Sequence, residues 1–197
     1  ETNNIALRLG TKVDSIDTKE QSISVQGETL SYDNLILTTG SWPRRLPAKI
    51  GGDLAGVYSM RDLTDADAMA NEFQEGRRTL IIGGGYIGLE AAAVAAKKRV
   101  NVTLVEMADR ILRRVAAPQT SDYFRAAHTA QGVDIREGVG LDHLIERDGR
   151  VGAAKLSDGS EIEIDFSIVG VCIFPASELA EAARITLEHC IQFDEFG

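Results

Sequence analysis

Three glycines and one acid carry the clearest chemistry in the sequence. Gly83, Gly85 and Gly88 follow the apolar residues 80–82 with the spacing G-x-G-x-x-G, and Glu106 lies 21 residues after Gly85. The first glycine permits a tight strand-to-helix turn, and the second removes the Cβ that would keep a pyrophosphate away from the backbone. The third lets the helix pack closely on the strands. Exposed N–H groups and the positive end of the helix dipole would then hold an anion.

The residues around this motif favour a dinucleotide site over a glycine-rich turn that merely packs a helix tightly. A strand-like run precedes the glycines, an alanine-rich helical pattern follows them, and a second strand-like run ends at Glu106. An acid at that position accepts hydrogen bonds from ribose hydroxyls and repels a 2′-phosphate, which predicts NAD(H). NADP(H) remains the less favoured alternative, because Arg110, Arg113 and Arg114 follow Glu106 and an arginine there could accommodate a 2′-phosphate.

Other kinds of chemistry find little support. The three histidines are scattered, and no nucleophile–base pair or shared pair of carboxylates is visible, so we assign no catalytic residue. Cys172 and Cys190 have neither CxxC spacing nor a Cys/His cluster, which predicts two half-buried thiols, with Cys172 as a packing residue, and no metal site. The net charge of −9 argues against non-specific nucleic-acid binding. No apolar run could span a membrane, and we expect a cytoplasmic protein.

The order of elements predicts an α/β fold with a parallel sheet. Residues 78–82, 101–106, 133–136 and 165–171 are expected strands, residues 86–98 and 118–131 expected helices, and residues 141–164 a meander with an Asp158-Gly159 hairpin. Thr64 is the expected N-cap of an earlier helix. Arg99 stands where a glycine would suit the left-handed end of the first of these helices, at a cost of about 1 kcal/mol.

The first forty residues are expected to form β structure. Residues 6–9, 12–16 and 22–25 alternate as short strands, and residues 35–39 resemble a buried strand that ends at Gly40. The chain begins without a methionine and ends without a terminating element, so we expect a piece of a longer protein.

Several segments together resemble the FAD-dependent pyridine nucleotide-disulfide oxidoreductases, in the branch of the ferredoxin reductases. They are YDNLILTTGSWPRRLP, YSMRDLTDADAM, LIIGGGYIGLEAAAVA, RVAAPQTSDYFRAAHTAQGVDIREG and DFSIVGVCIFPASELAEAA. The resemblance implies an FAD domain that is split in sequence around an inserted NAD domain. It therefore implies a Rossmann-like three-layer domain at residues 46–171, flanked by FAD-domain segments at residues 1–45 and 172–197.

The resemblance also implies roles for individual residues. It places Thr39, Gly40 and Arg61 near FAD. On the NAD side it adds Tyr86 and Ile87 at the interface of flavin and nicotinamide, Glu90 near the carboxamide, and Gly170 where the nicotinamide approaches. The sequence departs from the family pattern after Gly170: Cys172 replaces a glycine and Ala176 a polar residue.

The implied function is hydride transfer from NADH to FAD, followed by electron transfer to a small iron–sulfur protein, a ferredoxin or rubredoxin. The arginines at 113 and 114 are expected to help dock that acidic partner. Alternatives with the same fold are an NADH oxidase, a coenzyme A-disulfide reductase or the flavin part of a nitrite reductase. A further alternative is a non-catalytic NADH-responsive module in which Cys172 disables hydride transfer.

Overall fold

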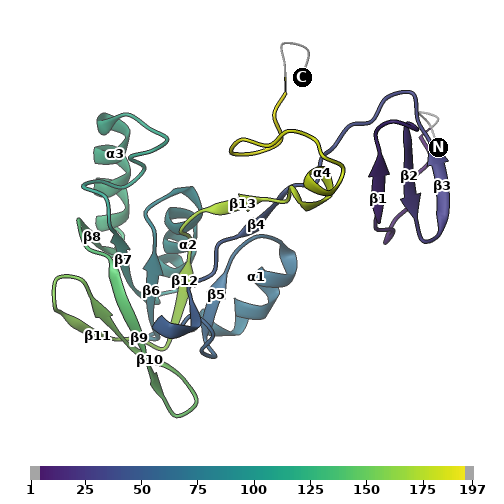
Figure 1. Ribbon diagram of the computed structural model, residues 1–197. Helices are drawn as coiled ribbons and strands as arrows, with labels where there is room; N and C mark the ends of the chain where they lie inside the picture. The colour runs from purple at the N-terminus through teal and green to yellow at the C-terminus, as the bar shows by residue number, and fades with distance from the viewer. Residues whose placement is uncertain (1–4, 194–197) are drawn as a thin grey trace. The chain divides into compact units, whose positions relative to one another are not determined.

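The computed structural model describes residues 5–193 of the chain (Figure 1). The chain divides into two compact units, one of residues 1–42 with 174–197 and the other of residues 43–173. We describe each unit by itself. The predicted assignment of residues 1–45, 46–171 and 172–197 to FAD- and NAD-binding domains stays a prediction.

A five-stranded parallel sheet forms the centre of the unit of residues 43–173. Its order is β5-β12-β6-β7-β8, and every neighbouring pair is parallel. The strands are β5 (Val57–Ser59), β12 (Phe166–Val169), β6 (Arg78–Ile82), β7 (Asn101–Glu106) and β8 (Asp134–Glu137). The three inner strands are nearly continuous apolar runs because both faces of the sheet are covered.

Helices cover one face of this sheet. They are α1 (Leu63–Met69), the 3₁₀ turn η2 (Ala70–Glu72), α2 (Tyr86–Lys97) and α3 (Pro118–Thr129). Leu89, Ala92 and Ala95 of α2 are buried in one cluster with Ile81 and Leu104 of the strands. The alanines bring α2 close to the sheet, which places its first turn beside the carboxyl end of β6.

An antiparallel meander covers the other face. It consists of β9 (Leu141–Arg147), β10 (Arg150–Leu156) and β11 (Glu161–Glu163), in the order β11-β10-β9. Val151 and Leu156 of the meander are buried against Leu80 and Ile82, which point away from the helices because side chains alternate along β6. The predicted three-layer α/β fold with a β-meander is confirmed.

At the helix ends one prediction is wrong and one is confirmed. The predicted N-cap Thr64 is wrong: Asp62 caps α1, accepting from the Asp65 N–H at 3.1 Å while Asp65 accepts from the Asp62 N–H at 3.3 Å. Two acids three residues apart satisfy both backbone groups, which one threonine could not. Arg99 does adopt the left-handed conformation after α2, with φ +60°.

The second unit contains a small antiparallel sheet of β1 (Ser15–Asp17), β2 (Ser22–Val25) and β3 (Glu28–Ser31). The same unit contains α4 (Glu178–Ala182), and the short 3₁₀ turn η1 (Ala48–Ile50) belongs to the unit of residues 43–173. The paired strands β4 (Ser41–Pro43) and β13 (Ile173–Pro175) each include residues on both sides of the division. The strands predicted at residues 6–9 and 35–39 are wrong. Residues 35–39 pair with no strand in the described part of the chain, and Ile36 is 84% exposed.

Candidate dinucleotide-binding site

The glycine motif, Glu106 and Gly170 all lie at the carboxyl edge of the parallel sheet. β6 ends directly before Gly83, β7 ends at Glu106, and β12 ends directly before Gly170. The Gly83 N–H donates to the Val105 carbonyl at 2.9 Å, and the Gly170 N–H donates to the Ile82 carbonyl at 2.8 Å. The edge where these strands end is where open α/β sheets bind ligands.

Gly83 and Gly88 are required by close packing. Gly83 has φ +106°, and a Cβ there would lie 2.5 Å from the Gly170 carbonyl oxygen. A Cβ at Gly88 would overlap the Gly83 carbonyl oxygen. The turn and the first part of α2 are therefore pressed against each other and against the end of β12.

Gly85 differs from both, because a Cβ built there would meet no atom within 4 Å. It occupies the N-cap position of α2, no side chain caps the helix, and no acid lies in the first turn. The free space in front of uncapped N–H groups suits an anion that approaches the backbone.

The carboxylate of Glu106 is fixed by two backbone donors. Its Oε2 accepts from the Gly84 N–H at 2.7 Å and its Oε1 accepts from the Ala108 N–H at 2.8 Å. A carboxylate offers about four acceptor positions, so two remain for hydroxyl groups. The sequence predicted an acid at this position but not its hydrogen bond to the Gly84 N–H of the glycine turn.

The segment after Glu106 is fastened by residues that the sequence did not single out. The Leu112 N–H donates to the Gly84 carbonyl at 2.9 Å, and Leu112 has φ +54°. The Ile111 N–H donates to Glu137 Oε1 at 2.8 Å, and Arg125 holds both oxygens of Glu137 at 2.9 Å. A bidentate arginine fixes the carboxylate, so residues 111 and 112 are held at the glycine turn. No local pattern marks these contacts, since each joins separate elements.

The three arginines after Glu106 all have partners within the chain. Arg110 donates to Ser121 Oγ at 2.7 Å, and Arg113 pairs with Asp109 at 2.5 Å. Both terminal nitrogens of Arg114 lie near Cys172 Sγ, at 3.7 and 3.8 Å. None of these contacts tests the predicted choice of cofactor, and none tests the predicted docking role of Arg113 and Arg114.

Cys172 is exposed, so the predicted packing role is wrong, and Cys190 is exposed as well. The conformation of Cys172, with φ +122°, is one that glycine adopts easily and that turns its side chain out of the core. Its carbonyl accepts from the Arg44 N–H at 3.0 Å. The Arg114 guanidinium, the Ile173 N–H and, by charge, Arg44 lower the pKa of the thiol below its ordinary value.

The remaining predicted site residues lie on three elements. Tyr86, Ile87 and Glu90 are exposed on the first turns of α2. The N–H of Arg61, just before α1, donates to Asp65 at 2.7 Å. In the other unit the Thr39 hydroxyl donates to the Ala176 carbonyl at 2.6 Å, and the Ala176 N–H donates to the Gly40 carbonyl at 3.0 Å. The structure describes these positions without testing their roles.

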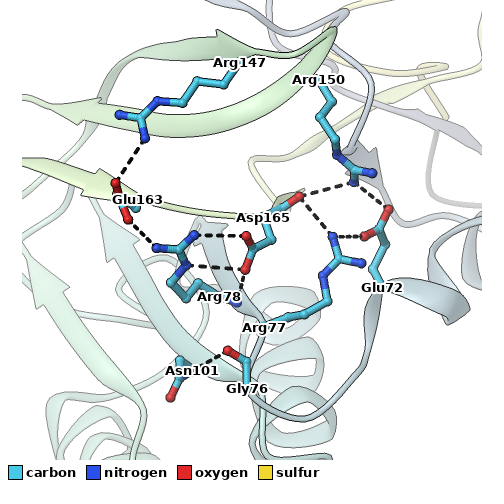
Figure 2. A network of polar contacts seen from close by, with 9 residues as sticks. All are labelled: Glu72, Gly76, Arg77, Arg78, Asn101, Arg147, Arg150, Glu163 and Asp165. Carbon is cyan, nitrogen blue, oxygen red and sulfur yellow. Dashed lines mark hydrogen bonds and ion pairs between the residues drawn. The ribbon is translucent and has the colours of Figure 1, made fainter.

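A network of ion pairs surrounds Arg78, where β6 begins, at the opposite edge of the sheet (Figure 2). Arg78 contacts both oxygens of Asp165 at 3.0 and 3.4 Å. Glu72, which is buried, pairs with Arg77 at 2.6 Å and with Arg150 at 2.8 Å. The network joins η2, the sheet and the meander, and thus supports the fold away from the candidate site.

Burial and hydrogen bonds oppose each other at Glu72. Burial raises the pKa of Glu72, but the Tyr58 hydroxyl, Arg150 and Arg77 together outweigh it and leave that pKa below the ordinary value. The hydrogen bond from Arg78 likewise lowers the pKa of Asp165. Both carboxyl groups are therefore ionised at neutral pH.

Across residues 5–193, no three or more His, Cys, Asp or Glu side chains gather closely enough to hold a metal ion. Within the same range, no helix is long and apolar enough to cross a membrane.

Comparison with known proteins gives consistent matches. A family model described as pyridine nucleotide-disulphide oxidoreductase matches residues 1–197. The ferredoxin–NAD(P)⁺ reductase of a Sphingomonas species is 42% identical over 173 residues, which are 87% of this chain and 42% of that protein. The putidaredoxin reductase of Pseudomonas putida is 38% identical over 198 residues, 98% of this chain and 47% of that protein.

Solved structures agree with the sequence matches. A ferredoxin reductase from Rhodopseudomonas palustris has a TM-score of 0.85 at 29% identity, over 97% of this chain and 50% of that one. The reductase in a covalent putidaredoxin reductase–putidaredoxin complex has a TM-score of 0.83 at 33% identity, over 96% and 50%. The chain therefore spans about half the length of the proteins it matches.

Proposed function

Because the chain belongs to the pyridine nucleotide-disulphide oxidoreductase family, we propose that its residues 46–171 bind NAD(H) at the carboxyl edge of the parallel sheet. One observation carries the proposal: the space in front of Gly85 is open while Gly83 and Gly88 are tightly packed. Glycine is thus required for close packing at Gly83 and Gly88, and at Gly85 it leaves the backbone open to a ligand. A bound pyrophosphate requires this combination.

The proposed roles follow the geometry of the site. The N–H groups at the start of α2 hold the pyrophosphate, and Glu106 accepts from the adenosine ribose hydroxyls with its remaining acceptor positions. Tyr86, Ile87, Glu90 and Gly170 form the nicotinamide side of the site. Thr39, Gly40 and Arg61 contribute to FAD binding in the whole protein.

In the whole protein we propose an NADH-dependent ferredoxin or rubredoxin reductase. When bound, the two cofactors supply the chemistry, a hydride from NADH that FAD accepts. The chain would contribute position: the packed glycines would determine where the dinucleotide binds, and the exposed side chains of Tyr86 and Ile87 would cover its nicotinamide end and exclude water. The names of the matched reductases support an iron–sulfur protein as the acceptor.

Cys172 favours one second candidate, a module that binds NADH without catalysing hydride transfer. Its exposed thiol follows Gly170 by two residues, where a close approach of the nicotinamide is expected. Adding NADH to the whole flavoprotein separates the two candidates: bleaching of the flavin absorbance supports the reductase, and binding without bleaching supports the module.

Calorimetric titration of this chain with NADH, and separately with NADPH, tests the proposal. We expect saturable binding with NADH clearly tighter. Glu106→Ala should weaken NADH by roughly tenfold, because the ribose loses a charged acceptor. Glu161→Ala, on the meander, is the matched control and should bind like the parent. Absence of NADH binding by the parent, or unchanged binding by the Glu106 variant, would refute the proposal.

A further inference from the structure

The side chain of Arg110 is held by a buried serine. Ser121 is fully buried on α3; its hydroxyl accepts from Arg110 Nη1 at 2.7 Å and donates to the Ile111 carbonyl at 2.6 Å. Arg110 Nη2 also donates to the Arg113 carbonyl at 3.2 Å. The guanidinium is therefore tied to α3 and to the local backbone.

Arg113 is held in a different way. It pairs with Asp109 at 2.5 Å, and the side chains of Arg113 and Asp109 are 55% and 68% exposed. Such an exposed pair is weak and screened by salt. The pair nevertheless places the negative charge of Asp109 beside Arg113 and so offsets the positive charge of Arg113.

Besides the bond from Ser121 to the Ile111 carbonyl, two further hydrogen bonds hold the backbone that carries these arginines. The Leu112 N–H is bonded to Gly84, and the Ile111 N–H to Glu137, which Arg125 clamps. Loss of the Asp109 pair would therefore release the Arg113 guanidinium, and loss of Ser121 would free Arg110 Nη1 while Nη2 keeps its contact with the Arg113 carbonyl. The two backbone bonds hold the segment in both cases. Arg110 and Arg113 follow Glu106 by four and seven residues in the sequence, and Glu106 ends the strand at which a 2′-phosphate would be bound.

We propose that Ser121 and Asp109 are specificity-determining residues that withhold Arg110 and Arg113 from the 2′-phosphate of NADPH. The inference rests on the proposed dinucleotide site and adds to it. Glu106 repels a 2′-phosphate, but a nearby guanidinium binds phosphate strongly. Selectivity for NADH then depends both on the acid and on the partners that keep these two arginines occupied.

The test measures dissociation constants of NADH and NADPH for the parent, Ser121→Ala and Asp109→Asn. Each substitution should lower the dissociation constant of NADPH by about two- to fivefold, because one exposed contact between phosphate and guanidinium contributes that much. The dissociation constant of NADH should change by less than about twofold. The gain should shrink at high salt because it is electrostatic.

Second-site variants assign the gain to the arginines. Arg110→Gln added to Ser121→Ala, and Arg113→Gln added to Asp109→Asn, should return NADPH binding to the parent value. If Ser121→Ala fails to fold, the exposed Asp109 pair decides the outcome. Unchanged NADPH binding in the folded variants, with normal NADH binding, would overturn the inference. Absence of NADH binding by the parent would instead refute the proposed site itself.

Discussion

The Cα atom of Gly88 lies so close to the carbonyl oxygen of Gly83 that a Cβ on Gly88 would overlap it. Gly83 is packed in turn against Gly170, so the glycines that directly follow β6 and β12 meet a glycine of α2 in one contact. Gly85, between them in sequence, takes no part in this packing. The motif therefore combines two requirements, close packing and ligand access, that substitutions can separate.

Gly88→Ala should destabilise the protein, whereas Gly85→Ala should spare its stability and weaken NADH binding. The added methyl group at Gly88 must displace backbone, at a cost of about 2–4 kcal/mol. The methyl group at Gly85 meets open space, so we expect a change of no more than about 1 kcal/mol, but it stands where the pyrophosphate approaches. Urea unfolding and NADH titration of both variants measure the two effects. Equal stability of the variants, or full NADH affinity in Gly85→Ala, would contradict this division.

Cys172 should react with iodoacetamide at lower pH than an ordinary thiol. Arg114 lies beside its sulfur and lowers its pKa by favouring the thiolate, which is the reactive form. In a Cys190→Ser background, Arg114→Gln should shift the pH midpoint of alkylation upward, and Arg113→Gln should leave it unchanged. A midpoint that does not move in Arg114→Gln would show that Arg114 does not stabilise the thiolate.

Saturating NADH should slow the alkylation of Cys172. The thiol follows Gly170, which contacts the glycine turn, so a nicotinamide bound at that edge would cover the sulfur. We expect at least about a threefold decrease in rate at saturation, as for a site largely covered by ligand. Labelling of Cys190 in a Cys172→Ser variant provides the control for general effects of NADH. Equal rates with and without NADH would place the nicotinamide elsewhere.

The sequence predicted the layers of this fold because their signals are local. The apolar run of residues 80–82, the glycine spacing and the alanines of α2 each specify a strand, a turn or a helix within a few residues. Residues 35–39 carry an equally apolar pattern, yet no strand forms there in the described part of the chain. A strand needs a hydrogen-bonding partner, and a pattern within one segment does not reveal whether the partner is present.

The contacts that shape the candidate site were largely beyond sequence reasoning. The Ser121–Arg110 and Glu137–Ile111 bonds join elements that only the fold brings together. The sequence placed Arg110 near Glu106 and left its role open between cofactor binding and other uses. The structure identifies Ser121 as its partner, an assignment that depended on the orientation of α3.

Glu72→Gln should destabilise the protein far more than Glu163→Gln, although both acids belong to one network (Figure 2). The side chain of Glu72 is 9% exposed and that of Glu163 is 59% exposed. Loss of the Glu72 charge leaves Arg77 and Arg150 without their buried partner, which should cost about 2–4 kcal/mol at pH 7. Loss of the exposed Glu163 pairs should cost less than about 1 kcal/mol. Urea unfolding measures both, and equal losses would contradict the role of burial.

The carboxylate of Glu72 should also make the stability of the protein depend on pH in the acid range. The pKa of Glu72 is lower in the folded protein than in the unfolded chain, so the folded state binds fewer protons between those two values. Its stabilisation is therefore complete above about pH 4.5 and is lost as the pH falls through the folded-state pKa. The parent should lose stability as the pH falls below the ordinary pKa of a glutamate, and Glu72→Gln should lose less, because one of the ionised groups is gone. An identical pH dependence of the unfolding free energy in parent and variant would mean that Glu72 does not contribute to the acid sensitivity.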